Sequence, residues 1–299
     1  MPVDFRYHLA SIMAVLCALL IGILVGIGLV GNPELEQQVA QFRTRLAEQR
    51  LRLQQMDQML RSEQAFAKEA LPRLIAGRLQ GRSVALVLNH DFERQELDEE
   101  LTTLLRSAGA NVLSSTMILP DFIRLKNRTA LPIIQEMGFE APFKGDLRSF
   151  LAGKMAVHIA QGKQQLPWRL KTEGLVKLTG NYEVPAGFVL IVAGAETGDV
   201  ASPLFIDLPM IRSLQEAGIP VIGCEGSKTA VSHVGYYQKL GISTVDNVDT
   251  TSGKLALVLT LVGAQGHWGE KAGARSRMPP LEILDRQRPQ PTSPVVPVP

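Results

Sequence analysis

The chain has 299 residues, which is enough for one large domain or two small ones. Its formal net charge is only +2 and aromatic residues make up 5% of it, so neither charge nor base stacking favours nucleic acid as a partner. The two cysteines, Cys17 in an apolar N-terminal segment and Cys224 in the globular part, give no disulfide framework and are not expected to pair within one chain.

The uncharged apolar segment of residues 9–30 predicts a transmembrane helix that follows a short N-terminus, residues 1–8. About 20 apolar residues are needed to cross a bilayer core. The segment is longer than the apolar region of a signal peptide and has a poor cleavage site after it, which favours an anchor over a cleaved signal. Arg6 precedes the segment and Glu34 and Glu36 follow it. This charge difference favours a single-pass topology with a cytoplasmic N-terminus and an extracytoplasmic globular domain.

Four small residues in this segment recur at i+4 spacing and share one helix face: Ala14, Ala18, Gly22 and Gly26. Small side chains let two membrane helices approach closely, so this face favours self-association of the anchor. The alternative is that glycine and alanine are simply frequent in membrane helices.

Residues 31–76 predict a coiled-coil stalk. Between residues 34 and 71 the chain has neither glycine nor proline, and apolar residues recur in alternating three- and four-residue steps. The members of this row are Leu35, Val39, Phe42, Leu46, Leu53, Met56, Leu60 and Ala67. Such a heptad pattern is typical of a coiled coil. The alternative is one long amphipathic helix that packs on its own globular domain.

Four arginines flank the heptad row at e and g positions: Arg43, Arg45, Arg50 and Arg52. In a parallel homodimer Arg45 would face Arg50 of the second chain, and like charges at these positions oppose self-pairing. The pattern therefore favours a partner helix with acidic flanks, or an antiparallel or trimeric arrangement. The alternative is a solvated basic face with Glu48 and Asp57 as local partners.

Residues 80–272 predict one globular α/β domain with a Rossmann-like, mostly parallel sheet. Short apolar runs predict strands at residues 84–88, 111–114, 188–193, 220–223 and 243–245. Segments between them predict helices at residues 93–107, 121–137, 146–161, 203–217, 229–240 and 252–263, with an irregular piece near Trp168. Alternating strands and helices with short connections favour a parallel sheet that is covered on both faces. Residues 273–299 are rich in proline and arginine and predict a disordered tail.

The loops that follow the predicted strands supply the candidate site residues, because doubly wound sheets bind ligands at the carboxyl ends of their strands. The loop after residue 223 superficially resembles a phosphate loop, but Ser227 stands where a Walker A motif needs glycine. An anion at this turn and an ordinary turn are the two alternatives. Cys224 with His233 is a weak candidate for a nucleophile–base pair, because no third partner is visible.

Asp246, Asn247 and Asp249 form the densest polar cluster after a predicted strand. Their side-chain oxygens are suitable ligands for Mg²⁺ or Ca²⁺, and together with Cys224 they are the weak candidates for a metal site. The alternative is that they turn the chain and cap the helix that begins near Ser252. The residues alone predict no catalytic set and no cofactor, so a metal-dependent enzyme is only the third hypothesis and no enzymatic activity is expected.

Several segments together resemble the mycobacterial copper transport protein B (MctB) family. They are the Tyr7-His-Leu entry to the apolar segment, the string Ser243-Thr-Val-Asp-Asn-Val-Asp249, and the string Gly266-His-Trp-Gly269. The resemblance covers most of residues 5–270. It implies copper transport, efflux or homeostasis in a bacterial cell envelope, and copper itself is implied by the resemblance only. For SteB-like members it also implies a coiled-coil scaffold or regulator of cell division and peptidoglycan hydrolysis, with an envelope or division protein as partner.

Overall fold

The computed structural model describes residues 5–29, 33–89, 95–140, 145–194 and 203–283. The chain divides into two compact units, residues 1–65 and residues 66–299.

Two long helices form the N-terminal part of the chain. Helix α1 (Phe5–Leu29) contains an apolar span, Tyr7–Gly26, that has a mean hydropathy of 2.7 and is long enough to cross a membrane. Helix α2 (Pro33–Ile75) is 43 residues long and continues through Pro72. Its C-terminal part, from Phe66 on, belongs to the second unit, where Ile75 is only 1% exposed and is part of the core.

The second unit is built on a seven-stranded sheet with the order β3-β2-β1-β4-β5-β6-β7. The strands are β1 (Ser83–Asn89), β2 (Asn111–Ile118), β3 (Val176–Gly180), β4 (Phe188–Ala193), β5 (Val221–Glu225), β6 (Ser243–Val245) and β7 (His267–Trp268). Every neighbouring pair is parallel except β2–β3, which is antiparallel. The predicted α/β class and the mostly parallel sheet are therefore confirmed, whereas the edge strands β3 and β7 were not predicted.

The helices of the second unit are α3 (Gln95–Ser107), α4 (Pro120–Ile123), α5 (Asn127–Glu136), α6 (Leu147–Ala160), α7 (Gln165–Thr172), α8 (Leu208–Glu216), α9 (Val234–Gln238) and α10 (Thr251–Val262). A π-helical turn, η2 (Pro203–Asp207), precedes α8. Three details differ from the sequence prediction. The helix expected at residues 121–137 breaks at Lys126, whose backbone is extended. The irregular piece expected near Trp168 is α7, and the helix expected at residues 229–240 shortens to the five residues of α9.

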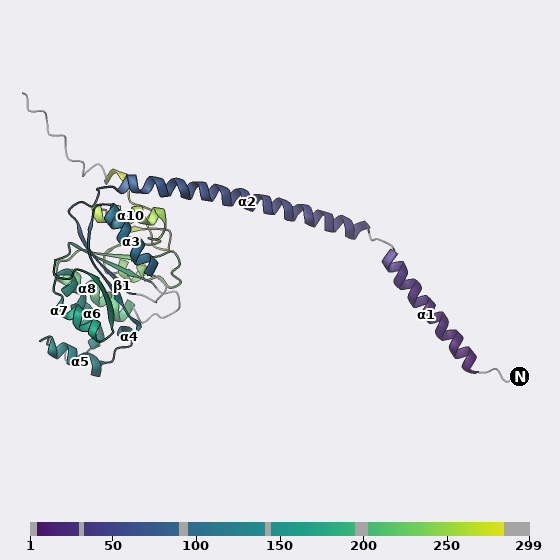
Figure 1. Ribbon diagram of the computed structural model, residues 1–299, viewed down its shortest axis with the longest axis horizontal. Helices are drawn as coiled ribbons and strands as arrows, with labels where there is room; N and C mark the ends of the chain where they lie inside the picture. The colour runs from purple at the N-terminus through teal and green to yellow at the C-terminus, as the bar shows by residue number, and fades with distance from the viewer. Residues whose placement is uncertain (1–4, 30–32, 90–94, 141–144, 195–202, 284–299) are drawn as a thin grey trace, which may run out of the picture. The chain divides into compact units, whose positions relative to one another are not determined.

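Side chains that alternate along the strands divide the core into two layers. Val87 and Ile191 belong to the layer under α5, α6, α7 and α8, whereas Leu86 and Leu190 belong to the layer under α3, α10 and the end of α2. Figure 1 shows these helices on the two faces of the sheet. Because both faces are covered, the central strands are apolar throughout, and each fully buried aliphatic side chain contributes about 1.5–3 kcal/mol to folding.

Helix α10 is held at its start by a polar cap. The Thr250 Oγ1 atom accepts the backbone N–H of Gly253 at 3.1 Å. Gly253 cannot carry a side chain here, because a Cβ atom would lie 2.0 Å from the carbonyl oxygen of Asn247. Ordered packing continues past residue 272, since Met278 and Ile283 contact the same core layer as α10.

Candidate functional site

Two buried carboxylates and a lysine lie at the carboxyl ends of β5, β6 and β7. Glu225 ends β5 and is fully buried, and Asp246 follows β6 and is 2% exposed. The Lys271 Nζ atom, from the turn after β7, contacts Glu225 Oε1 at 2.9 Å. This is the sheet edge at which a parallel α/β fold usually binds its ligands.

The predicted metal candidates at this edge mostly hold the turns of the chain. The two carboxylate oxygens of Asp246 accept the backbone N–H groups of Glu270 and Lys271, at 2.8 and 3.1 Å. Burial raises the pKa of the Asp246 carboxyl, although these two backbone bonds lower it. Asn247 takes a left-handed backbone conformation with φ of 52°, which asparagine tolerates better than most residues. Asp246 and Asn247 thus shape the turn after β6, whereas the side-chain cap of α10 comes from Thr250 rather than from the predicted residues.

Asp249 occupies the turn that superficially resembles a phosphate loop. Its Oδ1 atom accepts the backbone N–H of Ser227 at 2.7 Å, and its Oδ2 atom accepts the Ser227 hydroxyl at 2.6 Å. A carboxylate of the chain itself thus takes the place that an external anion would need. The helix after this turn, α9, has only five residues, so its N-terminus adds little to anion binding.

Cys224 lies on the opposite face of the sheet from His233. The Cys224 side chain belongs to the core layer that contains α3 and α10, whereas Tyr237, one turn after His233, belongs to the other layer. Cys224 is fully buried, and burial raises the pKa of its thiol well above the ordinary value. The pairing of Cys224 with His233 that the sequence suggested does not occur in this arrangement.

The structure instead pairs His233 with Asp207, a residue that the sequence analysis did not single out. The His233 Nδ1 atom lies 2.8 Å from Asp207 Oδ2, and the Tyr237 hydroxyl donates to the same oxygen at 2.5 Å. His233 is 1% exposed, and Asp207 and Tyr237 are fully buried. Burial and the adjacent Asp207 carboxylate raise the pKa of Tyr237 well above its ordinary value, so the phenol keeps its proton.

Glu225 links His233 to the edge of the sheet. Its Oε2 atom accepts the backbone N–H of His233 at 2.9 Å, and its Oε1 atom accepts the Ser232 hydroxyl at 2.7 Å. These bonds fix residues 232 and 233 before α9 and explain why the helix does not begin at Thr229. Gly223 leaves space for the Tyr237 ring, because a Cβ at that position would lie 2.4 Å from Tyr237 Cδ2.

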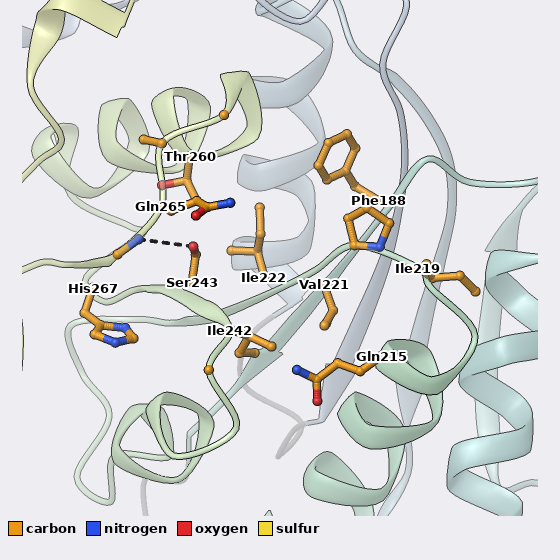
Figure 2. Close-up of a pocket in the computed structure, with 15 residues that line it drawn as sticks. Phe188, Gln215, Ile219, Val221, Ile222, Ile242, Ser243, Thr260, Gln265 and His267 are labelled. Carbon is orange, nitrogen blue, oxygen red and sulfur yellow. Dashed lines mark hydrogen bonds between the residues drawn. The ribbon is translucent and has the colours of Figure 1, made fainter.

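A separate cavity of about 420 Å³ lies at the amino ends of β5 and β6. Figure 2 shows that Ile222, Ser243, Gln215 and His267 line it, and its dashed line marks the 3.2 Å bond from the backbone of Gly266 to Ser243 Oγ. No charged side chain lines this cavity within the described part of the chain, so it offers little specificity for a charged ligand.

The residues expected to mediate association are exposed on α1 and α2. The exposed small residues of α1 are Ala14, Ala18, Gly22 and Gly26, and the exposed arginines of α2 are Arg43, Arg45, Arg50 and Arg52. The apolar row of α2 is also exposed, with Phe42 at 65% and Leu46 at 50%. A shallow groove along Val39, Phe42 and Leu46 is bordered by Arg43 and Arg50.

A scan of family models matches residues 2–279 to the copper transport outer membrane protein family, MctB. The chain belongs to this family. The match includes α1, α2 and every strand and helix from β1 to β7, so it does not rest on the globular domain alone. A search of curated proteins finds no significant match. Membership in the MctB family identifies a copper-transport-related envelope protein, and the apolar span of α1 is consistent with membrane association.

Proposed function

We propose that this protein is a single-pass, membrane-anchored component of copper transport or homeostasis that acts as a scaffold rather than as a channel. The observation that carries the proposal is the MctB family match over residues 2–279. The described chain offers one helix, α1, that is long and apolar enough to cross a membrane. A single helix satisfies its own backbone hydrogen bonds but encloses no lumen, so a pore would need several chains to assemble.

The proposed orientation places the N-terminus in the cytoplasm and the α/β domain outside it. Support comes from Arg6 before the apolar span and from Glu34 and Glu36 after it. In this arrangement the α/β domain meets copper and other envelope proteins, and it carries out no catalysis.

The exposed row on α2 supports a partner-binding role for the stalk. Val39, Phe42 and Leu46 present apolar surface, and Arg43 and Arg50 border it. Apolar surface flanked by one sign of charge suits a partner helix with acidic flanks. The same observation favours the second candidate function, a coiled-coil regulator of cell division and peptidoglycan hydrolysis.

Deletion of the gene in the native cell, followed by return of the wild-type gene, tests the two functions together. The copper proposal expects that deletion lowers copper tolerance and changes the copper content of the cell, and that the wild-type gene restores both. Unchanged copper tolerance would contradict it. Chained cells with altered sensitivity to cell-wall hydrolysis, without a copper effect, would support the second candidate instead. A Leu46→Ala variant tests whether either effect needs the stalk.

A further inference from the structure

The cavity at the amino ends of β5 and β6 lies at the opposite edge of the sheet from Glu225. Its volume of about 420 Å³ falls in the range of roughly 300–1,000 Å³ that small-molecule sites occupy. The cavity crosses the edge of the sheet, because Val221 belongs to the core layer that contains α8 and Ile222 to the layer that contains α10. The fold therefore leaves room for a small molecule at a place that the copper-related function does not use.

Glycines at the ends of helices keep this cavity open. Gly263 is the C-cap residue of α10, and Gly241 follows α9. Their φ values of 139° and 73° are positive, and glycine adopts such values most readily. A Cβ atom added at either glycine would have no neighbouring atom within 4 Å. The chain thus ends these helices without placing a side chain that would fill the space.

Uncharged polar groups line the cavity beside the aliphatic surface of Val221 and Ile222. The amide groups of Gln215, near the end of α8, and Gln265, in the turn after α10, come from opposite faces of the sheet (Figure 2). Amide side chains both donate and accept hydrogen bonds. A ligand at this place therefore meets polar groups from two sides and apolar surface between them.

Two hydrogen bonds within the chain determine what these polar groups offer a ligand. The Gln215 Nε2 atom donates to the carbonyl oxygen of Leu240 at 2.8 Å, which leaves the Oε1 atom of Gln215 as an acceptor. The Ser243 Oγ atom accepts the backbone N–H of Gly266 at 3.2 Å, which leaves the Ser243 hydroxyl proton to donate. The cavity thus offers both a donor and an acceptor, a combination that matches hydroxyl groups.

Charge narrows the class of ligand further. Among the described residues no charged side chain lines the cavity. Arg82 lies over the ring of Phe188, a lining residue, at 5.1 Å from its centroid, and it donates to the carbonyl oxygen of Val262 at 3.4 Å. A charged ligand would lose hydration without gaining an ion pair. A wholly apolar ligand would leave the amide and hydroxyl groups without their water partners.

We propose that this cavity binds an uncharged saccharide unit. The hydroxyl groups around a sugar ring both donate and accept, which matches Ser243 and Gln215, and the C–H faces of the ring suit the aliphatic surface of Val221 and Ile222. The site does not depend on the copper-related function proposed above, so the failure of one leaves the other standing.

Methyl NMR of the full-length chain with labelled isoleucines tests the inference. The chain is purified in a detergent with polyoxyethylene head groups, because maltoside or glucoside head groups would compete for the site. Titration with N-acetylglucosamine and with maltose should give saturable shifts at the lining residues Ile219, Ile222 and Ile242. Ile133 and Ile134, in the core layer that contains α5, are internal controls that should not shift.

Variants of Gln265 separate this cavity from the rest of the surface. Gln265→Ala removes an amide partner and should weaken binding about 3–10-fold. Gln265→Trp should abolish binding, because its ring fills the space. Gln135→Ala, which truncates an exposed glutamine on α5, is the matched control that should leave the affinity unchanged. The isoleucine spectrum of each variant shows whether it is folded.

Charged analogues test the chemical class. Glucose 6-phosphate and glucosamine should both bind more weakly than the neutral sugars, because neither finds a counter-charge. The inference is overturned by any of three results: no saturable shift with either neutral sugar, shifts spread evenly over all isoleucines, or a charged analogue that binds as tightly. Unchanged affinity in folded Gln265→Trp also overturns it.

Discussion

Helices α10 and α2 both carry many apolar side chains, but α10 buries its apolar residues in the α/β unit, whereas the apolar row of α2 from Val39 to Leu60 is exposed. Every residue of α10 from Leu255 to Val262 is buried. On α2, Val39, Phe42 and Leu46 are between 42% and 65% exposed. Amphipathic rows of this length are seldom left in water, because contiguous exposed apolar surface promotes association.

This difference in exposure indicates that the apolar side chains of α10 and those of α2 have different roles. The α10 side chains face β4, β5 and β6 and stabilise the α/β domain. The α2 row finds no partner inside the compact unit of residues 1–65, which contains only α1 and most of α2. We therefore predict that these apolar residues form a contact outside this unit, and the variants below test that prediction.

The largest expected effect comes from a matched pair of leucine truncations, Leu259→Ala in α10 and Leu46→Ala in α2. Leu259 is fully buried, so its truncation should lower the free energy of unfolding of the domain by about 2–5 kcal/mol. Leu46 is 50% exposed, so its truncation should leave domain stability within about 0.5 kcal/mol of the wild-type value.

Denaturant unfolding of both variants, followed by circular dichroism and Trp fluorescence, makes the measurement. A clear loss of domain stability in Leu46→Ala would contradict the comparison. It would favour the alternative in which the long helix packs on its own globular domain.

The sequence predicted the central strands well because a continuous apolar run is visible in the sequence of each strand itself. Runs such as residues 84–88 and 188–193 are apolar at every position, which is how a strand that is buried on both faces must read. The edge strands gave no such signal. In β3 only Val176 is buried, so hydrogen bonding to β2, rather than sequence pattern, decides its conformation.

The candidate site was harder to predict, because its residues meet only through the fold. Asp207 and His233 are 26 positions apart and come from the ends of different helices. The sequence drew attention to Asp246 and Asp249 because they lie three positions apart, yet in the structure their carboxylates accept hydrogen bonds from other turns of the chain. An isolated aspartate before an amphipathic helix, such as Asp207, normally indicates a helix cap and nothing more.

A smaller effect is expected from the charges beside the exposed α2 row. In a parallel homodimer Arg45 opposes Arg50 of the second chain, so Arg50→Glu should convert two like-charged pairs into attractive ones. Each exposed pair contributes about 0.2–1 kcal/mol, and added salt should reduce the gain. Sedimentation and thermal melts of the stalk peptide, residues 34–76, measure the change at low salt.

The control for this prediction is the double variant Arg45→Glu with Arg50→Glu, which merely creates another like-charged pair. It should pair with itself as poorly as the wild-type stalk does. A wild-type stalk that is already a tight parallel dimer at low salt, and that Arg50→Glu weakens, would remove the reason to expect an acidic partner helix.

The smallest expected effect is a pH dependence that the stability of the α/β domain should show and the association of the stalk should not. Burial, with Lys163 and Lys154 nearby, lowers the pKa of His158 below its ordinary value of 6.5. The unfolded chain therefore binds a proton at His158 more readily than the folded chain does. The contribution of His158 to folding stability is fully present above pH 6.5, and it is lost as the pH falls through the lowered pKa of the folded protein. Domain stability should decline between pH 7 and pH 5, and His158→Gln should flatten that decline even if the lost edge contact with Phe139 lowers stability at every pH. The raised pKa of Asp246 works in the opposite direction, because it favours the folded state in acid. This contribution is the same in the wild type and in His158→Gln, so it drops out of the difference between their two pH profiles.

The stalk is the control for this prediction. Residues 33–75 contain no histidine, so stalk association measured over the same pH range should show no histidine-dependent step. An equal pH slope in the wild type and in His158→Gln would show that His158 does not titrate differently on folding.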